Sequence, residues 1–126
     1  MIDRGLAAAG GASYHRRMPR PQAQVLVCLN ERPPEAQKPS CSRRGSLAVY
    51  NQFKDRVREM GLRDGVMVTR TGCLKHCSHG ITVAVWPHNL WYQNVTVADV
   101  DEILATSVAG GGKPVERLLM PDIPWE

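Results

Sequence analysis

All four cysteines of this 126-residue chain lie between residues 28 and 77, and they form two pairs along the sequence. Cys28 and Cys41 are separated by twelve residues, whereas Cys73 and Cys77 are separated by three. Four thiolates are the ligand set of an iron–sulfur cluster or of a tetrahedral zinc ion. If the four serve one site, the fold must bring two distant segments of the chain together.

Composition limits the class of protein. The chain is 43% hydrophobic and 22% charged, as expected for one globular domain, and no apolar run reaches the ~18–20 residues of a membrane helix. The net charge is +4, but residues 1–24 hold four arginines against one aspartate and so account for +3 of it. No basic stripe with interleaved aromatic residues is present. We therefore expect neither a nucleic-acid partner nor membrane insertion.

Three regions are predicted along the chain. Residues 1–23 contain glycines and prolines without a helical or strand period, so they are expected to form a flexible basic arm. Their apolar patch, residues 6–12, is short, interrupted by glycines and preceded by Asp3, which makes it a poor secretory signal peptide and favours a cytoplasmic location. Residues 24–120 form the predicted domain, and residues 121–126 form a short C-terminal tail.

The first half of the domain reads as a strand followed by a helix. Residues 24–29 are rich in β-branched apolar side chains and predict a buried strand that contains Cys28. A polar, proline-rich loop follows and leads to Cys41. A helix is then predicted from its apolar spacing, with Gly61 as its C-terminal cap. Its predicted buried face consists of Leu47, Tyr50, Phe53, Val57 and Met60.

The second half predicts three strands and a helix. The strands are expected at 66–68, 81–86 and 90–92, with a tight turn at 87–89 that makes the last two a hairpin. Thr96 followed by Asp99 predicts the start of a final helix. Its predicted buried face is Val97, Val100, Ile103 and Leu104. This order indicates an α/β sandwich in which a βαβ unit precedes a hairpin and a C-terminal helix, with both cysteine pairs where strands run into loops.

Spacing alone leaves several chemistries open. Disulfides are rare in reducing compartments, and neither pair has the Cys-x-x-Cys spacing of a redox dithiol. In structural zinc sites the two ligands of each pair are usually close together in the sequence, whereas twelve residues separate the first pair here. The cysteine runs of plant-type and bacterial ferredoxins are also absent. Two alternatives remain. One is a [2Fe–2S] centre with one widely spaced pair and one Cys-x₃-Cys pair, and the other is a zinc-stapled interaction domain.

A family resemblance becomes specific at this point. The segments Val25 to Cys28, Ser40-Cys41, Gly72-Cys73-Leu74, Val83 to Pro87 and Pro114 to Leu118 occur in the order seen in thioredoxin-like [2Fe–2S] ferredoxins. The chain resembles this family, which includes the Shethna-type ferredoxin of nitrogen fixers, and more distantly the small NADH-dehydrogenase subunit. The match covers about residues 24–120.

The resemblance implies a one-electron carrier, not an enzyme, with a thioredoxin-like sandwich fold and often a homodimer. It implies that a [2Fe–2S] cluster is bound by Cys28, Cys41, Cys73 and Cys77, and that other redox proteins are the partners. A different class also fits, namely a redox-responsive binding protein that protects an oxygen-sensitive enzyme. The two differ in whether affinity for a partner depends on the oxidation state of the cluster.

Several residues near the cysteines have open roles. Many relatives carry Gly-Pro or Gly-x between the last two cysteines, where this chain has Leu74-Lys75-His76, and added positive charge there is expected to raise the potential. His76 and His79 are interpreted as exposed loop residues, with His76 as a fifth candidate ligand. Trp86 and Trp91 are interpreted as core or dimer-interface residues. The adjacent Arg43-Arg44 pair either steers an acidic partner or forms a solvated turn.

Overall fold

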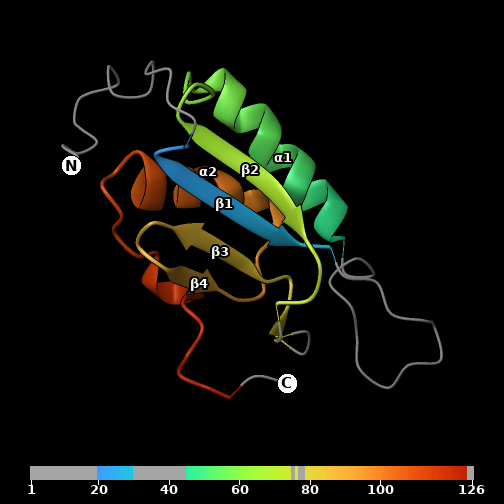
Figure 1. Cartoon of the computed structure of the whole chain (residues 1–126). Coiled ribbons are helices and arrows are strands. Elements are labelled where there is room, and N and C mark those ends of the chain that lie inside the picture. Colours follow the sequence, from blue (N-terminus) through green and yellow to red (C-terminus); the bar gives the residue numbers. More distant parts are fainter. Residues whose placement is uncertain (1–19, 30–44, 75, 77–78, 125–126) are drawn as a thin grey trace.

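A computed structural model describes residues 20–29, 45–74, 76 and 79–124 of the chain. Along the chain come β1 (Ala23–Cys28), α1 (Ser46–Glu59), β2 (Val66–Thr71), β3 (Val83–Trp86), β4 (Leu90–Tyr92) and α2 (Val100–Ile103) (Figure 1). A 3₁₀ turn, Val97–Asp99, leads into α2, and a π-helical turn, Leu104–Val108, continues it. In the part of the chain described, no helix has the length and apolar character needed to cross a membrane.

The four strands form one mixed sheet in the order β2-β1-β3-β4. β1 runs parallel to β2, and its register pairs Ala23 with Val66 and Cys28 with Thr71. β3 is antiparallel to both β1 and β4. Together β1, α1 and β2 form the predicted βαβ unit, and β3 with β4 forms the predicted hairpin.

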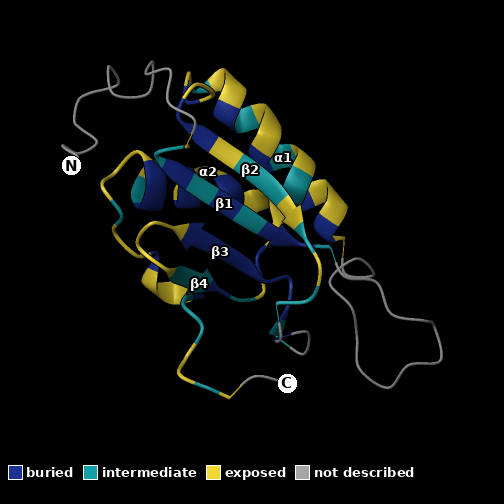
Figure 2. Cartoon of the chain, in the orientation of Figure 1, coloured by how far each residue is buried: buried dark blue, intermediate teal, exposed yellow. Residues whose placement is uncertain are grey.

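Both helices cover the same face of the sheet. Successive residues of a strand point to opposite faces, so Val25 and Val27 of β1 share a face with Val83 and Val85 of β3. These four residues are 0% exposed and belong to one core with the inner sides of α1 and α2. Figure 2 shows β3 as mostly buried and the outer side of α1 as exposed. The sandwich therefore has two layers.

Two predicted core positions are wrong. Leu47 of α1 is 51% exposed and Val97 is 44% exposed. The buried stripe of α1 runs through Ser46, Val49, Phe53 and Val57, which share one helical face, and Leu47 lies about 100° away from Ser46 around the axis. Val97 lies in the 3₁₀ turn, whose spacing differs from that of the α-helix for which its burial was predicted.

The start of the second helical segment is confirmed, and its cap is well satisfied. Asp99 Oδ2 accepts hydrogen bonds from the Thr96 backbone N–H and hydroxyl, both at 2.9 Å, and Asp99 Oδ1 accepts one from Arg117 at 2.8 Å. Burial alone would raise the pKa of Asp99, but these hydrogen bonds outweigh it and hold the pKa below its usual value. Arg117 also binds Glu102, and the two carboxylates raise the pKa of its guanidinium.

A buried hydroxyl ties the hairpin to the C-terminal part of the chain. Tyr92, at 0% exposure, lies 2.5 Å from the Ser107 hydroxyl and accepts a hydrogen bond from the Val115 N–H at 3.0 Å. Ser107 in turn donates to the Lys113 carbonyl at 2.8 Å. The network joins β4, the π-helical turn and the segment after it.

Replacing Tyr92 by Phe should therefore destabilise the fold by about 1–3 kcal/mol, because it leaves the buried Val115 N–H without an acceptor. Urea unfolding followed by circular dichroism measures this. Tyr50→Phe is the matched control, since the Tyr50 ring is only half-buried, and it should change stability by less than about 0.5 kcal/mol. Equal effects of the two substitutions would contradict this account of the network.

Candidate metal centre

The parallel pair of strands brings two of the predicted ligands to one end of the sheet. Cys28 is the last residue of β1 and is 1% exposed. Cys73 is half-buried and follows β2 by two residues. Because Cys28 is in register with Thr71, β1 and β2 end at the same edge of the sheet (Figure 1). Both cysteines therefore lie at the carboxyl end of the parallel pair.

The other two predicted ligands, Cys41 and Cys77, lie outside the described residues. Within the described ranges, no three His, Cys, Asp or Glu side chains gather as a metal ion would require. Cys77 directly follows His76 in the sequence, and Cys41 precedes Gly45 by four residues. The assignment of the full four-cysteine set remains a prediction.

Hydrogen bonds hold the described part of the Cys73–Gly80 segment against the sheet. The Cys28 N–H donates to the Thr82 carbonyl at 3.1 Å, and the Thr82 hydroxyl donates to the His76 carbonyl at 3.3 Å. The His79 N–H also donates to the His76 carbonyl, and the Asn94 N–H donates to the His79 carbonyl, both at 2.9 Å. Thr82, which is 1% exposed, thus links the end of β1 to the second cysteine segment.

His76 is buried, which corrects the prediction of an exposed loop residue. It is 5% exposed, and its ring packs edge-on against Trp91 at a centroid distance of 6.0 Å and against His79 at 6.4 Å. Its Nδ1 has no hydrogen-bond partner in the described part of the chain. His79 is half-buried. Packing against Trp91 of the neighbouring hairpin, which the sequence did not reveal, accounts for the burial of His76.

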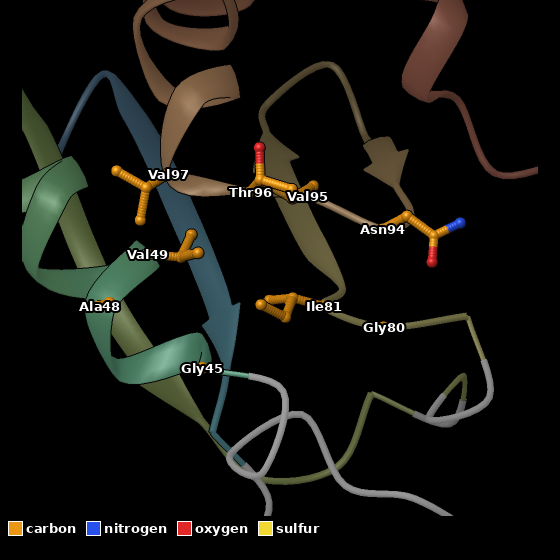
Figure 3. Close-up of a pocket in the computed structure, with 9 residues that line it drawn as sticks. All are labelled: Gly45, Ala48, Val49, Gly80, Ile81, Asn94, Val95, Thr96 and Val97. Carbon is orange, nitrogen blue, oxygen red and sulfur yellow. The ribbon is translucent and has the colours of Figure 1, made fainter.

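An open groove of about 500 Å³ lies beside this end of the sheet (Figure 3). It separates the first turn of α1 from the Gly80-Ile81 segment and from the chain leading into the 3₁₀ turn. The nine described residues that line it include no ionisable side chain. They are Gly45, Ala48, Val49, Gly80, Ile81, Asn94, Val95, Thr96 and Val97.

Two positive charges, one from α1 and one from β2, lie beside the Tyr50 ring. The Tyr50 ring has the Lys54 ammonium and the Arg70 guanidinium each 5.7 Å from its centroid, on geometry suited to cation–π attraction. Arg70 precedes Cys73 by three residues. The predicted pair Arg43-Arg44 lies outside the described residues.

Ser46 is a buried polar residue at the start of α1 to which the sequence analysis gave no role. It is the first residue of α1 and is 0% exposed, and its hydroxyl has no hydrogen-bond partner in the described part of the chain. A serine beside a glycine at a predicted helix start usually signals a solvent-exposed cap, so the sequence carried no sign of its burial.

Comparisons with known proteins identify relatives of the chain in sequence and in fold. No family model matches the chain. It is 39% identical over 97 residues to a 2Fe-2S ferredoxin of Aquifex aeolicus, covering 76% of this chain and 86% of that protein. It is 35% identical over 101 residues to a 2Fe-2S ferredoxin of Clostridium pasteurianum, covering 80% of this chain and 98% of that protein.

Solved structures give the same result for the fold. The crystal structure of the thioredoxin-like [2Fe-2S] ferredoxin from Aquifex aeolicus at 1.5 Å resolution superimposes with a TM-score of 0.74 at 37% identity. The alignment covers 81% of this chain and 99% of that one. These relatives are ferredoxins, a class of electron-transfer proteins. The chain belongs to the thioredoxin-like [2Fe–2S] ferredoxin family.

The Thr82 hydroxyl gives a direct test of how the second cysteine segment is held. Thr82→Val keeps the side-chain shape but removes the donor to the His76 carbonyl, which should cost about 1 kcal/mol and speed amide exchange in residues 73–80. Hydrogen-exchange mass spectrometry measures the second effect. Thr69→Val, on the half-exposed part of β2, should leave exchange in this segment unchanged. Unchanged exchange in Thr82→Val would show that the hydroxyl does not hold the segment.

Proposed function

We propose that this chain is a one-electron carrier that holds a single [2Fe–2S] cluster through Cys28, Cys41, Cys73 and Cys77. The observation that carries the proposal is the exit of Cys28 and Cys73 from adjacent, parallel, in-register strands in a chain of this family. Covalent connection supports the rest of the set, since Cys77 adjoins His76 and only four positions separate Cys41 from the start of α1.

The described residues fit such a group chemically. Cys28 is enclosed and Cys73 is half-buried, which places the thiol groups at the boundary between the core and the surface. When bound, the cluster accepts and returns one electron. The chain's own part is to supply thiolates, to exclude water at the Cys28 side, and to place hydrogen-bond donors near the sulfurs.

Ferredoxins pass electrons to redox partners, and this chain is expected to do the same with partner proteins. Four cysteines kept as ligands need a reducing environment, which supports a cytoplasmic location.

The cluster-bearing chain is further proposed to form a homodimer through the uncovered face of its sheet. Both helices lie on the other face, and strand register places Met67, Gln24 and Trp86 in one row of the uncovered face. Leu26, Ala84 and Trp91 form the next row. Met67 is 47% exposed and Trp86 is 37% exposed, so this face presents large apolar side chains that a second copy could bury.

Trp86→Lys should make the chain monomeric, because a second copy would have to bury an unpaired ammonium group at the interface. Light scattering coupled to size-exclusion chromatography measures the mass. Leu47→Lys is the matched control, since Leu47 is a more exposed apolar residue on α1, away from the sheet face, and it should leave the dimer intact. A wild-type monomer, or a dimer that survives Trp86→Lys, would contradict this interface.

Cys73→Ala tests the ligand assignment, because alanine offers no atom that could bind iron. The variant should lose the cluster, seen as loss of visible absorbance and of iron and sulfide after anaerobic reconstitution. His76→Ala should keep the cluster with a changed potential, which separates cysteine ligation from a histidine ligand. A Cys73→Ala protein with wild-type absorbance and iron content would refute the assignment.

A further inference from the structure

One buried polar group at this end of the fold has no hydrogen-bond partner among the residues that the structure describes. The Ser46 hydroxyl is fully enclosed and has no hydrogen-bond partner among the described residues. Leaving such a group unpaired costs about 1–3 kcal/mol. Other buried hydroxyls in the described fold do have partners, for example Thr82 with the His76 carbonyl and Ser107 with the Lys113 carbonyl. Ser46 therefore calls for a specific explanation.

The position of Ser46 in α1 indicates which way its side chain faces. It continues the buried stripe of α1 through Val49, Phe53 and Val57, which packs against the sheet. In a right-handed βαβ unit, the helix between two parallel strands begins at their carboxyl end. Figure 1 shows this end of α1 beside the ends of β1 and β2, and Figure 3 shows Gly45 there. The Ser46 side chain therefore lies on the sheet-facing side, at the end from which Cys28 and Cys73 emerge.

The N-terminus of α1 has features that favour an anion beside it. α1 has 14 residues, and its N-cap, Gly45, has a left-handed backbone with φ 92° and no side chain to cap the helix. Its first turn contains no acidic residue. The first amide N–H groups of a helix lack intrahelical acceptors and carry a partial positive charge of roughly half a unit. Neither a side-chain cap nor an acidic side chain of the first turn therefore supplies a negative group there.

We propose that Ser46 is a positioning residue of the metal centre, whose hydroxyl donates a hydrogen bond to an anionic sulfur bound there, with the N-terminus of α1 adding its positive end. This inference rests on the proposed function, because it takes the anionic sulfur to be a cysteine thiolate or a sulfide of the bound cluster. The buried hydroxyl then gains its missing partner, and the uncapped helix end gains its missing anion.

The expected consequence is a raised reduction potential. A hydrogen bond and a helix N-terminus both favour the form with more negative charge on the sulfurs, which is the reduced form. Ser46→Ala removes the donor without adding volume. At a fixed solution potential it should shift the ratio of reduced to oxidised protein about tenfold towards oxidised, equivalent to about 59 mV for a one-electron couple.

The experiment is an anaerobic redox titration of the cluster-loaded full-length chain, followed by visible absorbance, for wild type and three variants. Ser46→Ala should titrate at a lower potential, whereas Ser46→Thr, which keeps a hydroxyl, should retain most of the wild-type value. Asn51→Ala, an exposed polar residue of the same helix, should have no effect. Resonance Raman spectra should show iron–sulfur frequencies that shift in D₂O for wild type and shift less for Ser46→Ala.

The outcomes separate the two proposals. If wild type loads and titrates while Ser46→Ala keeps its potential and its D₂O shift, the inference about Ser46 is wrong and the proposed function stands. Equal shifts in the alanine and threonine variants would also overturn it, since the hydroxyl would then not matter. A wild-type chain that takes up no cluster under anaerobic reconstitution overturns the proposed function, and with it this inference.

Discussion

The parallel pairing of β1 with β2 is the constraint on which the rest of the site depends. In-register parallel strands must end at the same edge, so the pairing of Cys28 with Thr71 brings two segments 43 positions apart in sequence to one place. The same pairing requires a crossover helix, whose first turn then lies at that edge. The hydrogen bonds between β1 and β2 thus gather two cysteines and the start of α1 at one edge. The antiparallel pairing of β1 with β3 adds Thr82, whose carbonyl accepts from the Cys28 N–H at that edge.

Buried polar groups in the C-terminal half of the fold differ from those at the cysteine end in whether they have hydrogen-bond partners. In the C-terminal half, Tyr92, Ser107 and the Asp99 cap form closed networks with short hydrogen bonds. At the cysteine end, by contrast, the Ser46 hydroxyl and His76 Nδ1 are buried and lack partners in the described part of the chain. Buried polar groups are nearly always paired, so unpaired ones next to predicted ligands are consistent with a site built around a further group.

Much of the fold could be predicted because local signals agree with the global arrangement. The turn at 87–89 fixes the hairpin, Thr96 and Asp99 form the predicted cap, and Gly61 adopts the left-handed backbone expected of a C-terminal cap. β2 runs to Thr71, three residues beyond its predicted end, because pairing with β1 continues past the apolar run. The final helix divides into 3₁₀, α and π turns, which its spacing did not reveal.

The site was less predictable than the fold, for a physical reason. The sequence gives the identity and spacing of the cysteines directly. The burial of a polar side chain depends instead on which residue of the folded chain packs over it. His76 was expected at the surface, yet Trp91 packs against it, and Ser46 was given no role, yet it is fully enclosed. Leu47 shows the converse, an apolar residue left exposed because the buried stripe of α1 begins one position earlier.

The most direct test of the central claim is an anaerobic visible spectrum of the purified chain, with iron and acid-labile sulfide assayed on the same sample. The account predicts a brown protein that contains about two iron and two sulfide ions per chain and is bleached by dithionite. A colourless protein with about one zinc ion per chain, still colourless after reconstitution with iron and sulfide, would contradict it and leave the four cysteines as a structural staple.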